Sequence, residues 1–264
     1  MKQFGHKPMT EELTPDGELR RRTIRAVVGF GLAGLVPFGV WKWLKSSPTD
    51  AGIRQPLREV LRLNARVGSA LFSPDHLAPT FPLAMAARNV RVNGREGLRS
   101  PVAGADTYAI RVEEPQPAGP PIRRELTMAD IRALPHQELV FQFKCIEGWS
   151  QIQHWGGVRF ADFVNRYVPR LSGPDAPYRY VGLETPDGGY YVGIDRASML
   201  HPQTLLAFDM NGRPLTEPHG APLRLIIPTK YGVKNLKRIG LIRFTSEPPR
   251  DYWAERGYDY YIGL

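Results

Sequence analysis

The chain has 264 residues, of which 42% are hydrophobic and 23% charged. This balance excludes a compositionally disordered protein and allows one sizeable core. Gly (26) and Pro (25) are frequent without any period, which favours a turn-rich fold over a helical bundle. The net charge of +9 raises the possibility of nucleic-acid binding, but much of the excess flanks one apolar segment. We therefore expect no nucleic-acid partner.

Residues 1–45 carry the pattern of an export signal or membrane anchor. Arg20, Arg21 and Arg22 precede an uncharged apolar segment at 26–41, which is short against the roughly 20 residues that span a bilayer. Moderate hydrophobicity behind paired arginines is typical of twin-arginine (Tat) signals. No clear cleavage site follows, so the sequence leaves open whether the segment is removed. We expect a periplasmic or otherwise extracytoplasmic protein that residues 26–44 can anchor to the inner membrane.

Residues 46–80 are predicted to form a tether with one helix at 56–63, where apolar positions recur with helical spacing. From residue 81 to 264 short strands alternate with turns. The expected elements there are a strand at 108–112, a helix at 126–134 capped by Thr127 and Asp130, and strands at 139–144, 223–227 and 239–245. The prediction is a mixed, strand-rich α+β domain over 81–264.

Cys145 is the only cysteine, so it has no intrachain disulfide partner. It stands where a predicted strand opens into a polar and aromatic loop at 146–150, which would make the thiol accessible. A soft thiolate suits a soft, redox-active metal. The alternative is an inert buried cysteine, and the residues by themselves leave both interpretations open.

A second candidate site runs from His219 to Lys237, where Arg and Lys alternate with Gly and Pro beside a predicted strand. Such a segment can hold a phosphate through charge-assisted hydrogen bonds, although a basic solvated loop has the same composition. The histidines show no zinc-type spacing. The sequence also lacks the Gly-x-Ser-x-Gly motif of hydrolases, the phosphate-binding loop and the dinucleotide-binding fingerprint.

Four segments in order resemble the sulfite oxidase superfamily of molybdopterin-dependent oxidoreductases. They are the cysteine segment 144–150, the segment 205–215, the pterin-binding stretch 219–237 and the end-of-domain segment 247–253. Their order and spacing agree over about residues 81–264. The resemblance implies a sulfite-oxidase-type domain that binds one molybdenum through the dithiolene of a single molybdopterin, with Cys145 as the protein's ligand to the metal.

The same resemblance implies roles for further residues. Cys145, Tyr190 and Arg88 match catalytic positions, although the adjacent Tyr191 leaves the tyrosine register ambiguous. The residues that match cofactor-binding positions are Arg88, Asn89, Cys145, Thr185, His219, Arg224, Asn235, Leu236 and Lys237.

The expected activity is oxygen-atom transfer on sulfite or on a small-molecule or protein S-oxide, with electrons exchanged with a separate heme-containing membrane protein or cytochrome. The layout is similar to that of the bacterial protein-methionine-sulfoxide reductase, which has Asn where this chain has His219; sulfite oxidases have His there. The dimerisation domain of the eukaryotic enzymes does not follow, so we expect a monomer. The alternative is a membrane-tethered binding module that has kept the fold and lost the metal. A binder of anionic lipid or nucleic acid is a third, weaker hypothesis.

Overall fold

The computed structural model describes residues 15–264 except 51, 100–103, 105, 106 and 117. The chain divides into two compact units. The first comprises residues up to Asp50 together with Arg54–Pro56, and the second comprises Ala51–Ile53 and Leu57–Leu264.

The first unit is dominated by one long helix, α1 (Pro15–Ser46). Within it, Arg20–Ser46 is a 27-residue candidate membrane span with a mean hydropathy of 1.6 over its most apolar window. The helix is longer than the predicted apolar segment because its charged flanks are also helical. Its length and composition would allow it to cross a membrane, and a signal sequence shares these properties. The short strands β1 (Thr49–Asp50) and β2 (Ile53–Arg54) follow α1 in the chain.

The second unit is a mixed α+β fold, which confirms the predicted fold class. Its helices are α2 (Gln55–Leu71), α3 (Met128–Arg132), α4 (Phe160–Tyr167) and α5 (Arg196–Met199). Its strands are β3 (Ala109–Glu114), β4 (Ile122–Thr127), β5 (His136–Lys144), β6 (Ser150–Arg159), β7 (Tyr180–Glu184), β8 (Tyr191–Asp195), β9 (Leu205–Met210), β10 (Arg213–Pro214), β11 (Arg224–Ile226) and β12 (Leu241–Thr245). Its 3-10 turns are η1 (Leu83–Met85), η3 (Pro169–Leu171), η4 (Glu217–His219), η5 (Gly232–Lys234) and η6 (Ala254–Arg256).

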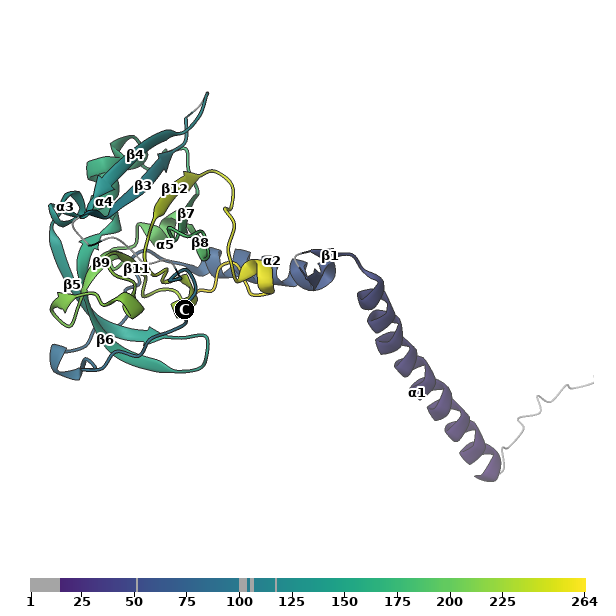
Figure 1. Ribbon diagram of the computed structural model, residues 1–264. Coiled ribbons are helices and arrows are strands. Elements are labelled where there is room, and N and C mark those ends of the chain that lie inside the picture. Colours follow the sequence, from purple (N-terminus) through teal and green to yellow (C-terminus); the bar gives the residue numbers. More distant parts are fainter. Residues whose placement is uncertain (1–14, 51, 100–103, 105–106, 117) are drawn as a thin grey trace, which may run out of the picture. The chain divides into compact units, whose positions relative to one another are not determined.

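The strands form two five-stranded sheets (Figure 1). One has the order β10-β9-β6-β5, with β11 also paired to β9, and all its pairs are antiparallel. The other has the order β4-β3-β12-β7-β8 and is antiparallel except for the parallel pair β3 and β12. The parallel pair joins strands far apart in sequence, which brings the C-terminal part of the chain back to the start of the domain.

Most predicted elements are present, with shifted ends. The strands predicted at 108–112, 139–144, 223–227 and 239–245 correspond to β3, β5, β11 and β12. The predicted helix at 126–134 is wrong at its start, because Leu126 and Thr127 complete β4. The cap was predicted correctly: the Thr127 hydroxyl accepts from the Asp130 N–H, and the Asp130 carboxylate accepts from the Thr127 N–H.

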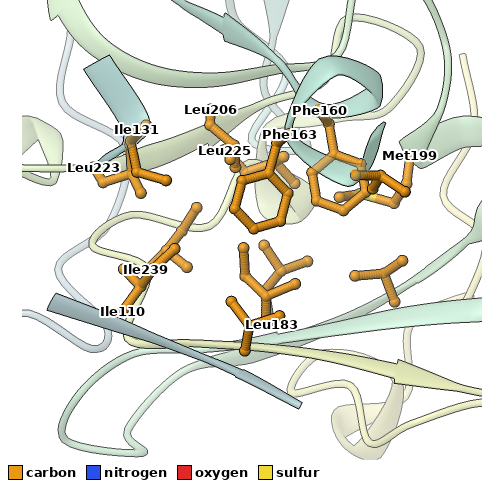
Figure 2. Packing of buried hydrophobic residues seen from close by; sticks show 14 of the residues in the cluster. Ile110, Ile131, Phe160, Phe163, Leu183, Met199, Leu206, Leu223, Leu225 and Ile239 are labelled. Carbon is orange, nitrogen blue, oxygen red and sulfur yellow. The ribbon is translucent and has the colours of Figure 1, made fainter. Parts of the chain in front are cut away.

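The larger hydrophobic cluster lies between the two sheets. Figure 2 shows Phe160 and Phe163 of α4 among side chains from both sheets. The ring centroids of these two residues are 5.6 Å apart. Leu206 comes from one sheet and Ile110 from the other, and both are fully buried. This packing fixes the two sheets against each other and so positions the loops that leave their edges.

Candidate active site

Cys145 directly follows β5, in the five-residue loop that joins β5 to β6. Its N–H donates to the Trp149 carbonyl at 2.9 Å, and its carbonyl accepts from the Gly148 N–H at 3.1 Å. Gly148 has φ +86°, a left-handed conformation that glycine adopts without a steric penalty. Cys145 is 5% exposed and packs in a second hydrophobic cluster with Phe143 and Trp155. The strand end predicted from the sequence therefore holds the thiol at the edge of the core.

Cys145 also lines a pocket. The volume of this pocket is about 230 Å³, slightly below the roughly 300–1,000 Å³ of sites for drug-sized molecules. The lining residues are Asn93, Gly94, Glu96, Cys145, Ile146, Glu147, Tyr190, Gly232, Val233, Asn235, Lys237, Trp253 and Tyr258. Burial raises the pKa of the Cys145 thiol, and the Glu147 carboxylate adds to this, while backbone N–H groups of the loop oppose it. A bound metal cation would be needed to favour the thiolate strongly.

Lys237 places an ammonium in the pocket wall. It is 4% exposed, and its Nζ donates to the carbonyls of Gly94 and Pro218 at 2.9 Å each. Burial, together with the positive charge of Arg224, lowers its pKa to about 7. Such a site favours a bound anion, because an anion would restore the charge of the lysine.

Arg224 lies behind the pocket and is buried. Its guanidinium carbon, Cζ, is 4.6 Å from the centroid of the Trp155 ring. Its guanidinium donates to the carbonyls of His219 and Asn235 at 2.9 and 3.2 Å, and its Nε is buried without a hydrogen-bond partner among the described residues. Burial lowers its pKa to about 9. Arg224 thus joins the two loops that carry the other polar residues of the site.

The side chains of two further predicted residues, His219 and Asn235, form hydrogen bonds within the protein. His219 Nδ1 lies 2.7 Å from the Thr216 hydroxyl, and Nε2 lies 3.1 Å from the Val90 carbonyl. Because a carbonyl only accepts, Nε2 carries the proton, and burial lowers the pKa of the ring and favours this neutral form. The Asn235 carboxamide accepts from the Ile227 N–H at 2.8 Å and so holds the loop while still lining the pocket.

Tyr190, rather than Tyr191, is among the residues that line the pocket. The Tyr190 hydroxyl donates to the Val233 carbonyl at 2.5 Å, and burial raises its pKa. Its backbone N–H donates to the hydroxyl of buried Thr185 at 3.1 Å. The Tyr191 hydroxyl donates instead to Glu255. Thr185 therefore acts on the pocket through the position of Tyr190.

The remaining predicted residues do not line this pocket. Arg88 and Asn89 are exposed, and their carbonyls accept from the side chains of Asn211 and Gln151 at 3.2 and 3.1 Å. Leu236 is fully buried, and its carbonyl accepts from the Leu225 N–H at 2.9 Å. The structure thus brings Cys145 and three other predicted residues together in the wall, with the rest behind it or on the surface.

Sequence reasoning missed several wall residues. Asn93, Gly94 and Glu96 come from the loop before β3, and Tyr258 comes from the C-terminal segment. Asn-Gly at 93–94 is a turn signal, but nothing local marks it as part of a site. Trp253 closes one of the four family segments, which could have suggested it.

Comparison with known proteins places this geometry in a family. Residues 98–253 match the oxidoreductase molybdopterin binding domain. The chain is 35% identical over 214 residues to a putative protein-methionine-sulfoxide reductase subunit from Azospira oryzae, covering 81% of this chain and 78% of that protein. The chain therefore belongs to the molybdopterin-binding oxidoreductase family and is an enzyme of that class.

Other relatives match over a shorter part. The catalytic subunits of protein-methionine-sulfoxide reductase from Xanthomonas axonopodis pv. citri and Campylobacter jejuni are 32% and 34% identical over 47% and 53% of this chain. The chain spans 42% and 52% of their lengths. The sulfane dehydrogenase SoxCD from Paracoccus pantotrophus matches with a TM-score of 0.46 and 15% identity, over 56% of this chain and 40% of that one.

The residues around the pocket fit a molybdopterin. Cys145 supplies a soft sulfur donor at the wall. Lys237 and Arg224 are two buried cations whose observed hydrogen bonds go to backbone carbonyls rather than to carboxylates. The Glu96 carboxylate, also in the wall, raises the pKa of Lys237 through space. Within the described residues neither cation is hydrogen-bonded to a carboxylate, which is costly for buried charge, and a phosphate would offset that cost. A sulfur donor beside buried positive charge matches a metal dithiolene with a phosphate.

Proposed function

We propose that this protein reduces S-oxides, with methionine sulfoxide in proteins as the substrate class. The observation that carries the proposal is Cys145 at a pocket whose wall and backing hold the buried cations Lys237 and Arg224. The names of the relatives from Azospira, Xanthomonas and Campylobacter support the S-oxide substrate. The balanced reaction is R₂SO + 2 H⁺ + 2 e⁻ → R₂S + H₂O, with the electrons drawn from a heme-containing membrane protein or cytochrome.

The protein's own residues would bind the cofactor and orient the substrate. Molybdenum held by molybdopterin supplies the oxygen-atom transfer and the two-electron redox chemistry. In this proposal the Cys145 thiolate ligates the metal, and Lys237 holds the phosphate by a charge-assisted hydrogen bond. Arg224, Thr185 and Asn235 position the loops around them. Trp253 and Tyr258 supply an apolar rim that suits a thioether side chain.

Sulfite is the second candidate, because His219 matches the residue that sulfite oxidases carry. The geometry gives it less support: both ring nitrogens of His219 are engaged within the protein, and the ring is neutral. A neutral, internally bonded imidazole offers little attraction to a dianion.

The test compares the two substrates on one preparation. Protein made in a host that synthesises the molybdenum cofactor is assayed with a peptide containing methionine sulfoxide and a reduced viologen, and with sulfite and an artificial electron acceptor. We expect turnover of the peptide and little oxidation of sulfite. Efficient sulfite oxidation without peptide reduction would reverse the substrate assignment.

In the same proposal the catalytic unit lies outside the cytoplasm and α1 holds it at the inner membrane. The 27-residue candidate membrane span in α1 supports this location. A membrane location would keep the enzyme near a membrane-bound electron donor.

A further inference from the structure

Helix α2 presents a row of large apolar side chains to solvent. Leu57, Val60, Leu63, Val67 and Leu71 are 47%, 54%, 55%, 49% and 80% exposed. Steps of three and four residues place them on one side of the helix. We call these five residues the α2 stripe. A continuous apolar row of this length on a protein surface marks an interaction site rather than scattered exposure.

The neighbouring side of α2 packs on the body of the second unit, so the helix is held in place. Arg58 is 8% exposed and donates to the Ala254 carbonyl at 2.8 Å. Gly68 faces Tyr261 so closely that an added Cβ would lie 2.7 Å from the ring. The α2 stripe is therefore not the core-facing side of the helix.

The polar side of α2 is basic. The helix contains Arg58, Arg62 and Arg66 against a single acid, Glu59, which forms an ion pair with Arg62. Arg66 is exposed and lies about 60° from Leu63 around the helix, at the edge of the α2 stripe. An apolar row beside an exposed arginine is found in helices that lie in the interface of a bilayer with anionic lipids. A helix that docks into an apolar groove of another protein would not require a basic residue beside its apolar row.

We propose that α2 lies in the membrane interface, with the α2 stripe in contact with lipid acyl chains and Arg66 at anionic headgroups. The chain link from Ser46, where α1 ends, to Leu57 is on the order of 35 Å when fully extended. If α1 spans the membrane, α2 begins within that distance of its surface. This contact is separate from the chemistry proposed above.

The contact would also place the active-site pocket near the bilayer. A groove beside α2 is lined by Gly68, Leu71 and Phe72 together with Ile146 and Tyr258. Ile146 and Tyr258 also line the Cys145 pocket. The mouth of that pocket thus adjoins the helix that we place on the lipid surface.

The experiment uses full-length protein in vesicles of phosphatidylcholine with or without phosphatidylglycerol. A Cys145→Ala background removes the native thiol, so the result does not depend on catalysis. An environment-sensitive fluorophore is attached at Val67→Cys, or at Ser69→Cys as the control. These positions lie about 160° apart around the helix. Unchanged circular dichroism and thermal midpoint show that each labelled variant is folded.

We expect brominated phospholipids to quench the Val67→Cys probe several-fold more than the Ser69→Cys probe, and aqueous iodide to do the reverse. The lipid quenching should increase with phosphatidylglycerol and decrease with salt. Equal quenching at the two positions would overturn the proposal. Two further results would overturn it. If protection of the Val67→Cys probe increases with the density of the protein in the vesicles, the α2 stripe contacts a second copy of the chain. If protection requires an added membrane protein, the α2 stripe contacts a protein partner.

Discussion

The reactivity of Cys145 depends on what surrounds its sulfur. Burial raises the pKa of the thiol, so in the cofactor-free protein it is a weak nucleophile. The same position beside Lys237 suits a thiolate bound to a cationic metal. Cys145 is therefore chemically unreactive without the metal and, in the proposed site, is required for metal binding when the metal is present.

Replacing Cys145 with Ser should abolish turnover while the fold remains. The change exchanges a soft donor for a hard one with almost no change in volume. We expect wild-type circular dichroism, a thermal midpoint within a few degrees of wild type and no measurable S-oxide reduction. A variant that retains full activity would refute the ligand assignment.

Lys230 makes the stability of the protein depend on pH. Burial lowers its pKa to about 7, although Asp195 lies 3.2 Å away and opposes the shift. The unfolded chain, with a lysine pKa near 10.5, binds more protons between pH 7 and 10, so the free energy of unfolding rises with pH in this window. From pH 7 to 9 we expect a gain of about 2 kcal/mol that Lys230→Met lacks.

Chemical unfolding at both pH values measures this gain. Lys144→Met, at an exposed position, serves as the control and should keep the wild-type pH dependence. The same pH dependence in Lys230→Met and in wild type would show that Lys230 does not titrate in this window.

The candidate site was only partly predictable from single residues. Cys145 was found because a strand end followed by a polar loop is a local pattern, and Lys237 because its segment resembles a family motif. Asn93 and Tyr258 lie about 50 and 110 residues from Cys145 and reach the pocket through tertiary packing. No local pattern carries that information.

At the scale of elements, the β5–β6 turn depends on Gly148. Its φ of +86° disfavours any residue with a Cβ, although the surrounding space is open. Gly148→Ala should lower the free energy of unfolding by about 1–2 kcal/mol through backbone strain alone. Gly148→Asn should cost less, because Asn tolerates this conformation better.

Gly173→Ala is the matched control, since an added Cβ there also meets open space and no positive φ constrains it. Chemical denaturation of the three variants measures the effect, and Gly173→Ala should stay within about 0.5 kcal/mol of wild type. Equal stability of Gly148→Ala and Gly173→Ala would show that the turn does not require glycine.

Element types were more predictable than their ends. The alternation around Ile110 and the Thr127–Asp130 cap are local signals, and both are present in the structure. The β4 strand ends with Thr127 because it pairs with β3 in the order Ala109↔Thr127, a contact that helical periodicity cannot reveal. The extension of α2 to Leu71 was missed because the predicted helix stopped at Leu63, although the helical spacing of apolar residues continues through Val67 and Leu71.

For the whole molecule, α1 is expected to remain in the membrane. The full-length protein, expressed in a bacterial host, should sediment with membranes and resist extraction by alkaline carbonate, as a spanning helix does. Western blotting of the fractions measures this. A shorter protein in the periplasmic fraction would show instead that α1 is a cleaved export signal.

The central claim is that Cys145 and the buried cations form a molybdenum site. The most direct measurement is elemental analysis by mass spectrometry of wild type and Cys145→Ala, both purified from a host that makes the molybdenum cofactor. We predict about one molybdenum per wild-type chain, as expected for a mononuclear site with one protein ligand, and a clear loss in the variant. Well-folded wild-type protein without molybdenum would contradict the account and favour a tethered binding module.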